Sequence, residues 1–170
     1  MRKLTLAILS LLALQCFPYG NIRVIKDEFK NQTAYTLDLY SNTNFTLQGS
    51  RALFLTFTKT INEGSKTVIR CYLSSEFSNH EQPLGRSAYF KLNNKIILIK
   101  FQSTKIIPNE IRNATWSSHS GEFILSDELQ KDLLNADSLS VRFYTGESPI
   151  DADLSSSDLR VIKELINIKP

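Results

Sequence analysis

The sequence is poor in the residues that shape the less common classes of protein. Its 170 residues include 6 glycines, 5 prolines and 2 cysteines. These small numbers exclude a collagen-like fibre and a dense disulfide scaffold. The glycines stand singly, so the chain has no glycine-rich phosphate-binding loop. Hydrophobic residues make up 42% of the chain and charged residues 22%, which is typical of a folded domain and not of a disordered one.

Long apolar runs are also scarce, and the longest stands near the N-terminus. Residues 4–14 are almost entirely apolar and directly follow Arg2 and Lys3. A cationic start before a short apolar run is typical of a secretory signal peptide. The run is too short for a membrane span, which needs about 20 apolar residues. We therefore predict that residues 1–16 direct export.

The apolar run ends at Cys16, and this cysteine suggests a particular kind of signal. Residues 1–16 resemble the signal of a bacterial lipoprotein, in which a cysteine after the apolar run is lipidated and becomes the first residue of the mature chain. The family pattern has leucine three places before the cysteine and a small residue directly before it, whereas Ala13 and Gln15 stand here. The resemblance makes Cys16 the lipidation candidate. The alternative is ordinary cleavage, with a signal that reaches as far as residue 20.

The second cysteine depends on the fate of the first. If Cys16 is lipidated, Cys71 has no partner within the chain, and if Cys16 remains unmodified, a Cys16–Cys71 disulfide is open. Cys71 alternates with Ile69 and Leu73, which places the three on one face of a predicted strand. We therefore predict a small buried hydrophobic side chain at Cys71 and not a reactive thiol.

The charge is small overall but unevenly distributed. The formal net charge is +3, and removal of Arg2 and Lys3 with the signal leaves 18 basic against 17 acidic residues, or +1. This near-neutral chain gives no electrostatic reason to expect nucleic-acid binding. Residues 91–112 carry +4, however, and residues 122–158 carry −7. The basic and the acidic region suit the binding of a polar partner. The alternative is that these charges keep the protein soluble and prevent its edge strands from pairing with other molecules.

Most of the chain after the signal alternates apolar and polar residues, which is the pattern of half-buried strands. It predicts strands over residues 35–40, 53–58, 67–73, 88–92, 95–101 and 139–144. Asn93 and Asn94 form a two-residue hairpin turn, since asparagine tolerates positive φ. A second turn is predicted at residues 62–65, and a longer loop at residues 74–86.

Two helices are predicted in the last third of the chain. Ser126 can cap a helix that begins at Asp127, and Ser155 can cap another with Asp158 three residues later. Strands that come first and helices that come later favour an α+β fold. We predict a single domain over residues 21–170, a mainly antiparallel sheet or sandwich with two C-terminal helices. Trp116 and the tyrosines are predicted to be core aromatics.

No catalytic constellation is visible in the sequence. The only histidines, His80 and His119, stand in polar segments that we predict to be exposed loops. A metal site that joins both histidines to a carboxylate such as Glu76 is the less favoured alternative. No serine-nucleophile elbow occurs. We therefore predict no catalytic, cofactor-binding or metal-binding residues.

Two further motifs have plain structural interpretations. Residues 151–158 alternate acidic and hydroxyl side chains like a calcium loop, but they lack its glycine and its distal glutamate, so we predict a polar loop before a capped helix. Asn31, Asn44 and Asn113 begin glycosylation sequons, which matter only in a eukaryotic secretory pathway. We expect turn and strand residues at these positions.

Taken together, these features predict an exported, non-enzymatic binding or structural module of the cell envelope. Its predicted location is periplasmic, anchored to the outer membrane or extracellular, and its membrane contact is limited to a lipid on Cys16. Two alternatives stay open. One is a ligand carrier with an apolar cavity between sheet and helices, and the other is an exported hydrolase whose site is assembled from loop residues.

Overall fold

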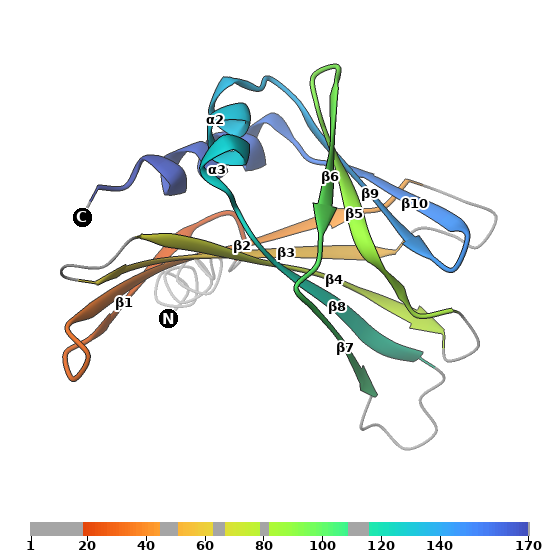
Figure 1. The fold of residues 1–170 in the computed structure, drawn as a ribbon, viewed down its shortest axis with the longest axis horizontal. Coiled ribbons are helices and arrows are strands. Elements are labelled where there is room, and N and C mark those ends of the chain that lie inside the picture. The colour runs from red at the N-terminus through yellow and green to blue at the C-terminus, as the bar shows by residue number, and fades with distance from the viewer. Residues whose placement is uncertain (1–18, 45–50, 63–66, 79–81, 109–115, 170) are drawn as a thin grey trace, which may run out of the picture.

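The computed structural model shows an α+β fold made of two antiparallel sheets and two helices near the C-terminus (Figure 1), as the sequence predicts. It describes residues 19–44, 51–62, 67–78, 82–108 and 116–169. The predicted signal at residues 1–16, including Cys16, lies outside the described residues. So does most of the turn predicted at residues 62–65.

The larger sheet has six strands in the order β1-β2-β3-β4-β8-β7. Every neighbouring pair in it is antiparallel. Its strands are β1 (Ile22–Asp27), β2 (Gln32–Asn42), β3 (Ala52–Asn62), β4 (Val68–Ser78), β7 (Ser103–Pro108) and β8 (Trp116–Ile124).

The smaller sheet has four antiparallel strands in the order β10-β9-β5-β6. Its strands are β5 (Leu84–Leu92), β6 (Lys95–Lys100), β9 (Leu139–Thr145) and β10 (Ser148–Asp153). The hairpin between β5 and β6 turns at Asn93 and Asn94 as predicted, with Asn93 at a φ of 52°. The helices are α2 (Asp127–Asn135) and α3 (Ser156–Asn167).

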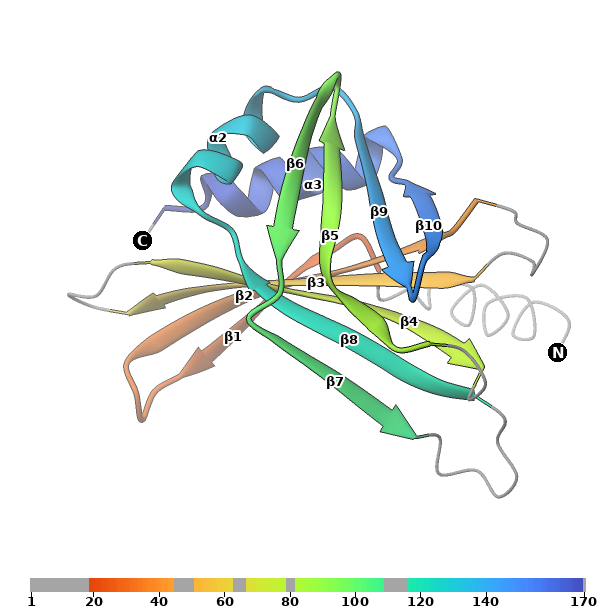
Figure 2. The ribbon, with the colours of Figure 1, turned by 45° about the vertical axis from the view of Figure 1, so that its right-hand side comes forward.

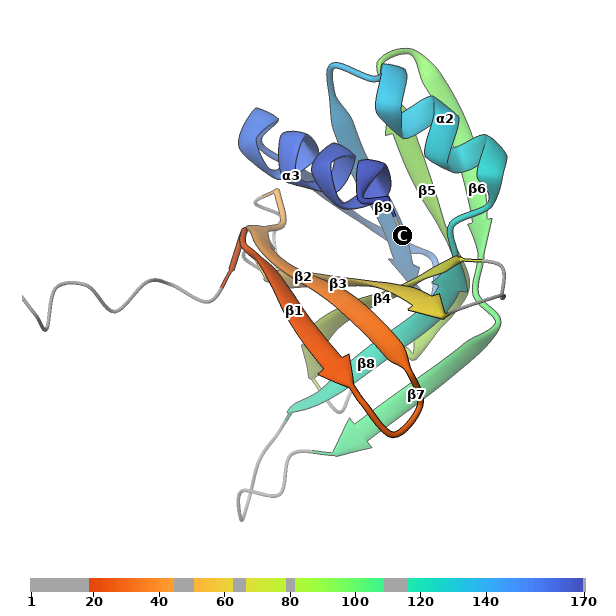
Figure 3. The ribbon, with the colours of Figure 1, turned by 90° about the vertical axis from the view of Figure 1, so that its left-hand side faces the viewer.

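The four-stranded sheet packs across one face of the six-stranded sheet, and its strands cross those of the larger sheet steeply (Figure 2). Both helices lie on this same face of the larger sheet, beside the smaller one (Figure 3). The inward side chains of both sheets and both helices form one buried cluster. Because the smaller sheet turns one face inward, its other face is left to solvent.

Aromatic pairs join the two sheets within the core. Phe90 of β5 meets Phe123 of β8 edge-on, with ring centroids 5.6 Å apart. Phe77 of β4 meets Phe143 of β9 in the same way at 6.3 Å. Edge-to-face contact is a favoured geometry for buried rings. These pairs fix how the two sheets face each other.

Both predicted helix caps are present. The Ser126 hydroxyl accepts a hydrogen bond from the Leu129 amide at 3.1 Å. Ser155 and Asp158 form a reciprocal capping box at the start of α3. Each cap satisfies backbone N–H groups that the first helical turn leaves without partners.

A buried lysine holds the other end of α3. Lys59 lies on the inner face of β3 and is only 5% exposed. Its Nζ donates to the carbonyl oxygens of Leu165, Ile166 and Ile168 at 3.3, 2.7 and 2.6 Å. The Leu165 carbonyl also accepts from the Ile168 amide at 3.4 Å, whereas the carbonyls of Ile166 and Ile168 lie at the helix end, where the helix itself supplies no N–H. Burial lowers the pKa of Lys59 from its ordinary value of 10.5.

Three predictions need correction. The loop predicted at residues 74–86 is shorter, because β4 continues to Ser78 and β5 begins at Leu84. Trp116 is not a core residue, since its side chain is 38% exposed, and none of the six tyrosines is buried. Phenylalanines fill the core instead, because a buried hydroxyl or indole N–H needs a partner that an apolar interior lacks.

Candidate functional site

The residues that the sequence singles out for catalysis do not form a site. His119 was predicted to lie in an exposed loop, but it is 3% exposed in the middle of β8. Its Nδ1 accepts a hydrogen bond from the Leu84 amide at 3.2 Å, and its Nε2 lies 2.9 Å from the Ser117 hydroxyl. The ring also packs on Phe77, with centroids 4.7 Å apart. His119 therefore satisfies buried backbone and side-chain groups.

The alternative metal site is also contradicted in part. Glu76 and His119 sit one register step apart on β4 and β8, so the pleat directs them to opposite faces of the sheet. The exposure of Glu76 and the burial of His119 agree with this placement. His80 lies outside the described residues. Among the residues that are described, no group of three or more histidine, cysteine, aspartate or glutamate side chains could hold a metal ion.

Cys71 behaves as a buried hydrophobic residue, as predicted. Its side chain is fully buried in β4, and burial raises the pKa of its thiol well above the ordinary value. A nucleophilic cysteine needs the opposite shift, because the thiolate is the reactive form. The Cys71 thiol is free.

The polar side chains that do converge lie on the outer face of the four-stranded sheet. Along β9 the buried Val141 and Phe143 alternate with Ser140, Arg142 and Tyr144, which point outward. The neighbouring strand β10 follows the same rule, with Ile150 and Ala152 inward and two aspartates outward. The antiparallel register sets these outward residues side by side.

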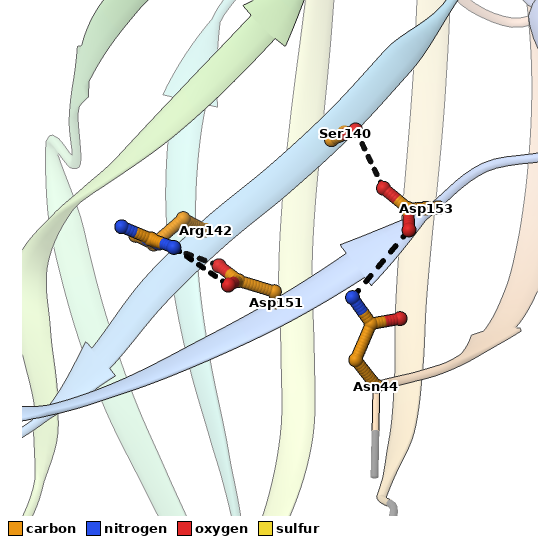
Figure 4. Close-up of polar contacts among 5 residues, drawn as sticks. All are labelled: Asn44, Ser140, Arg142, Asp151 and Asp153. Atoms are coloured by element: carbon orange, nitrogen blue, oxygen red, sulfur yellow. Dashed lines mark hydrogen bonds and ion pairs between the residues drawn. The ribbon is translucent and has the colours of Figure 1, made fainter. Parts of the chain in front are cut away.

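The register places Arg142 directly opposite Asp151, and the two form a bidentate ion pair (Figure 4). Arg142 Nε lies 2.6 Å from Asp151 Oδ1, and Nη2 lies 2.7 Å from Oδ2. Two parallel charge-assisted bonds fix the orientation of both groups. The hydrogen bonds that Arg142 donates to Asp151, together with the negative charge of Asp151, raise the pKa of Arg142 well above its usual range.

The second aspartate is held from both sides. Asp153 stands opposite Ser140, whose hydroxyl donates to Oδ1 at 2.6 Å, while the Asn44 side-chain amide donates to Oδ2 at 3.4 Å (Figure 4). Asn44 comes from the segment after β2, and its backbone N–H bonds the Asp151 carbonyl at 2.7 Å. The Ser41 hydroxyl donates to the Asp153 carbonyl at 3.1 Å. The end of β2 and the residues that follow it therefore tie the six-stranded sheet to the edge of β10.

These polar groups border an open hollow of about 440 Å³. Tyr89 and Tyr144 add two aromatic rings, which meet edge-on at 6.2 Å. Lys91 and Ile96 complete the lining from β5 and β6. The volume falls in the range of small-molecule sites, which span about 300–1,000 Å³. The hollow combines aromatic surface with oriented hydrogen-bond donors and acceptors.

The prediction of a polar loop at residues 151–158 is wrong for its first residues. Asp151 and Asp153 lie in strand β10, and only Leu154 and Ser155 separate that strand from helix α3. The carboxylates bond to protein donors and do not surround a cation site. The sequence signal was the alternation of Asp151 and Asp153 with Ile150 and Ala152, whose period of two is that of a strand.

Within the described residues, no helix is long and apolar enough to cross a membrane. Comparisons with protein family models, with characterised proteins and with solved structures find no match for this chain.

Proposed function

We propose that this protein is an exported, non-enzymatic binding module of the cell envelope. We place its ligand site in the hollow on the outer face of the four-stranded sheet. The observation that supports this most directly is the pairing of a fixed Arg142–Asp151 fork with the rings of Tyr89 and Tyr144 in one hollow. The charged start and apolar run of residues 1–16 support export.

The chemistry of the hollow favours a neutral, polyhydroxylated ligand such as a saccharide. Asp151 and Asp153 already accept protein hydrogen bonds, yet each carboxylate has lone pairs to spare. Ligand hydroxyl groups can use those lone pairs without breaking any existing contact. An ionic ligand would instead compete with the Arg142–Asp151 pair, and separating such a pair leaves a charge without its partner. The tyrosine rings provide surface for the C–H face of a sugar ring.

The same contacts favour binding over hydrolysis. A glycosidase needs one carboxyl group as a proton donor and a second as a base or nucleophile. Asp151 accepts two hydrogen bonds from the guanidinium group of Arg142. Asp153 accepts from Ser140 and Asn44. Both carboxylates are thus engaged as acceptors, and neither is placed as an acid.

The space between the sheets and the helices is filled by buried side chains, which include Phe57, Leu133 and Ile162. This packing is the reason that we place the ligand outside the core and do not favour a carrier with an internal cavity. Lipid that co-purifies with the protein in a fixed ratio would instead support the carrier.

Calorimetric titration with neutral disaccharides (maltose, cellobiose and N,N′-diacetylchitobiose) tests the proposal. We expect at least one to bind, and we expect Tyr144→Ala to weaken that binding about tenfold, the value of one aromatic contact. Tyr72→Ala is the matched control, because Tyr72 is a half-exposed residue on β4 of the other sheet. Absence of binding to all three sugars, or equal losses in the two variants, contradicts the proposal. Turnover of a sugar that Asp151→Asn abolishes would show an enzyme.

The export proposal has its own test in the intact mass of the protein from its native host. A mature chain that begins at Cys16 and carries added acyl mass establishes a lipoprotein. A chain that begins at residues 17–21 without acyl mass establishes ordinary cleavage. A chain that retains residues 1–16 overturns export by a cleaved signal.

A further inference from the structure

The edge of the four-stranded sheet at β6 is open to another strand. β6 is the outermost strand on its side of the sheet (Figure 2). The Phe101 amide donates to the Arg86 carbonyl at 3.0 Å. These two residues extend the β5–β6 ladder by one step, and they form a hydrogen-bonded pair. Bonded and non-bonded pairs alternate along an antiparallel ladder. The N–H and C=O groups of Ile96, Leu98 and Lys100 therefore point away from β5.

These outward backbone groups have no partner within the part of the chain that the structure describes. The side chains of Ile96 and Leu98 are 67% and 47% exposed. They share the outer face of the sheet with Tyr89, which stands opposite Leu98 in the register. A strand added to β6 would gain backbone bonds and place its own alternate side chains beside this apolar pair.

The charge around β6 selects the partner. Lys91, Lys95, Lys100 and Lys105 are the charged residues of the segment 91–108, which contains no acidic residue. Lys95 is paired with Asp132 at 2.7 Å, and the other three are exposed. Edge lysines discourage pairing with a second positive strand and favour an acidic one. Because Ile96, Leu98 and Lys100 share one face, the complement of β6 is an extended segment that carries apolar and acidic residues on the same face.

A second copy of this chain fits the edge poorly. Pairing β6 with β6 of another copy would gather the Lys95 and Lys100 side chains of both. The acidic strand of the molecule is β10, but the backbone carbonyls of Asp151 and Asp153 on its edge are already bonded to Asn44 and Ser41. A different polypeptide is the occupant that remains.

We propose that the β6 edge binds an extended acidic peptide from another protein by strand addition. The main chain of the peptide bonds to Ile96 and Leu98. On the outer face of the sheet, its side chains are apolar beside Ile96 and Leu98 and acidic beside Lys100. This inference goes beyond the saccharide site, because it rests on the open backbone of β6 and not on the polar groups of the hollow.

The probe is a blocked peptide of about six residues, an ordinary strand length, with two valines and one glutamate on one face and threonines on the other. The matched control replaces the glutamate by lysine. In amide NMR spectra we expect the glutamate peptide to shift the signals of Ile96 and Leu98 and to slow their hydrogen exchange. Binding should weaken with added salt, because exposed charges are screened. Equal binding of both peptides, or shifts centred elsewhere, overturns the proposal.

Two variants test the mechanism. Leu98→Pro removes one outward N–H group, and an edge strand tolerates proline where the N–H faces away from its neighbour. The loss of this one hydrogen bond should weaken peptide binding about three- to tenfold. Lys100→Glu should weaken peptide binding by a similar factor and leaves the backbone N–H groups in place. This variant therefore tests the proposal if the proline variant fails to fold. Lys26→Glu on the distant strand β1 is the control. Unchanged affinity in Lys100→Glu contradicts the proposal.

The peptide and saccharide proposals can fail separately. Tyr144→Ala should weaken sugar binding and leave peptide binding intact, and Lys100→Glu should weaken peptide binding and leave sugar binding intact. A protein that dimerises through β6 in the absence of peptide would also overturn the inference, because the edge would then serve a second copy.

Discussion

Replacing Lys59 by methionine, on the inner face of the six-stranded sheet, should strongly reduce the stability of the folded protein. The side chain keeps its length but loses three donors to the carbonyls of Leu165, Ile166 and Ile168. It also removes the cation from the end of α3, whose last turn has no basic residue of its own.

The magnitude follows from the contacts that are lost. An unsatisfied buried carbonyl costs about 1–3 kcal/mol. The three oxygens share one donor group and lie at a helix end that water can reach in part, so their costs do not add in full. Relief from burying the ammonium group offsets some of the loss. We expect the free energy of unfolding to fall by about 3 kcal/mol.

Urea denaturation followed by circular dichroism measures this change. With an m-value of about 2 kcal/mol/M, the midpoint should fall by about 1.5 M. Lys26→Met on the exposed strand β1 is the control and should change the midpoint little. A Lys59→Met variant that unfolds at the same urea concentration as the control would refute the argument, because the hydrogen bonds would then contribute no net stability.

Two further predictions concern the core. Gly121→Ala should cost about 1–3 kcal/mol, because the new Cβ would stand 2.5 Å from the Phe101 ring that covers it, whereas Gly85→Ala, with its nearest atom at 3.4 Å, should cost less in the same urea experiment. Burial raises the pKa of Cys71, so above its ordinary value of 9.0 the unfolded chain releases a proton that the folded protein retains, and stability should fall as pH rises. Unfolding experiments at about pH 8 and about pH 10 should show a smaller loss in Cys71→Ala than in the natural protein, and equal losses would contradict the assignment.

Much of the fold could be predicted from local patterns. The alternation in β3, β4 and β9 and the serines that cap α2 and α3 are short-range signals, and the structure confirms them. Strand β8 was missed because it looks polar. His119 and Gly121 lie on its buried face because the Leu84 amide bonds the His119 ring and the Phe101 ring covers Gly121. A single sequence does not show those partners.

The candidate site was missed for a related reason. Its residues alternate along β9 and β10, so the period of two was present in the sequence. The run of acidic and serine residues at 151–158 instead suggested a polar loop before a helix. Only the register that sets Arg142 opposite Asp151 and Ser140 opposite Asp153 turns scattered polar residues into a site. Strand pairing depends on contacts far apart in the chain, which local patterns do not determine.

The most direct test of the proposed function is a map of amide chemical shifts during titration with the tightest-binding neutral disaccharide. We predict that the shifts centre on Tyr89, Arg142, Tyr144 and Asp151, which border the hollow, and leave the outer face of the six-stranded sheet around Tyr72 unchanged. Shifts that centre on the six-stranded sheet would contradict the assignment of the hollow as the ligand site. The absence of any shift at a saturating concentration of the disaccharide would contradict it as well.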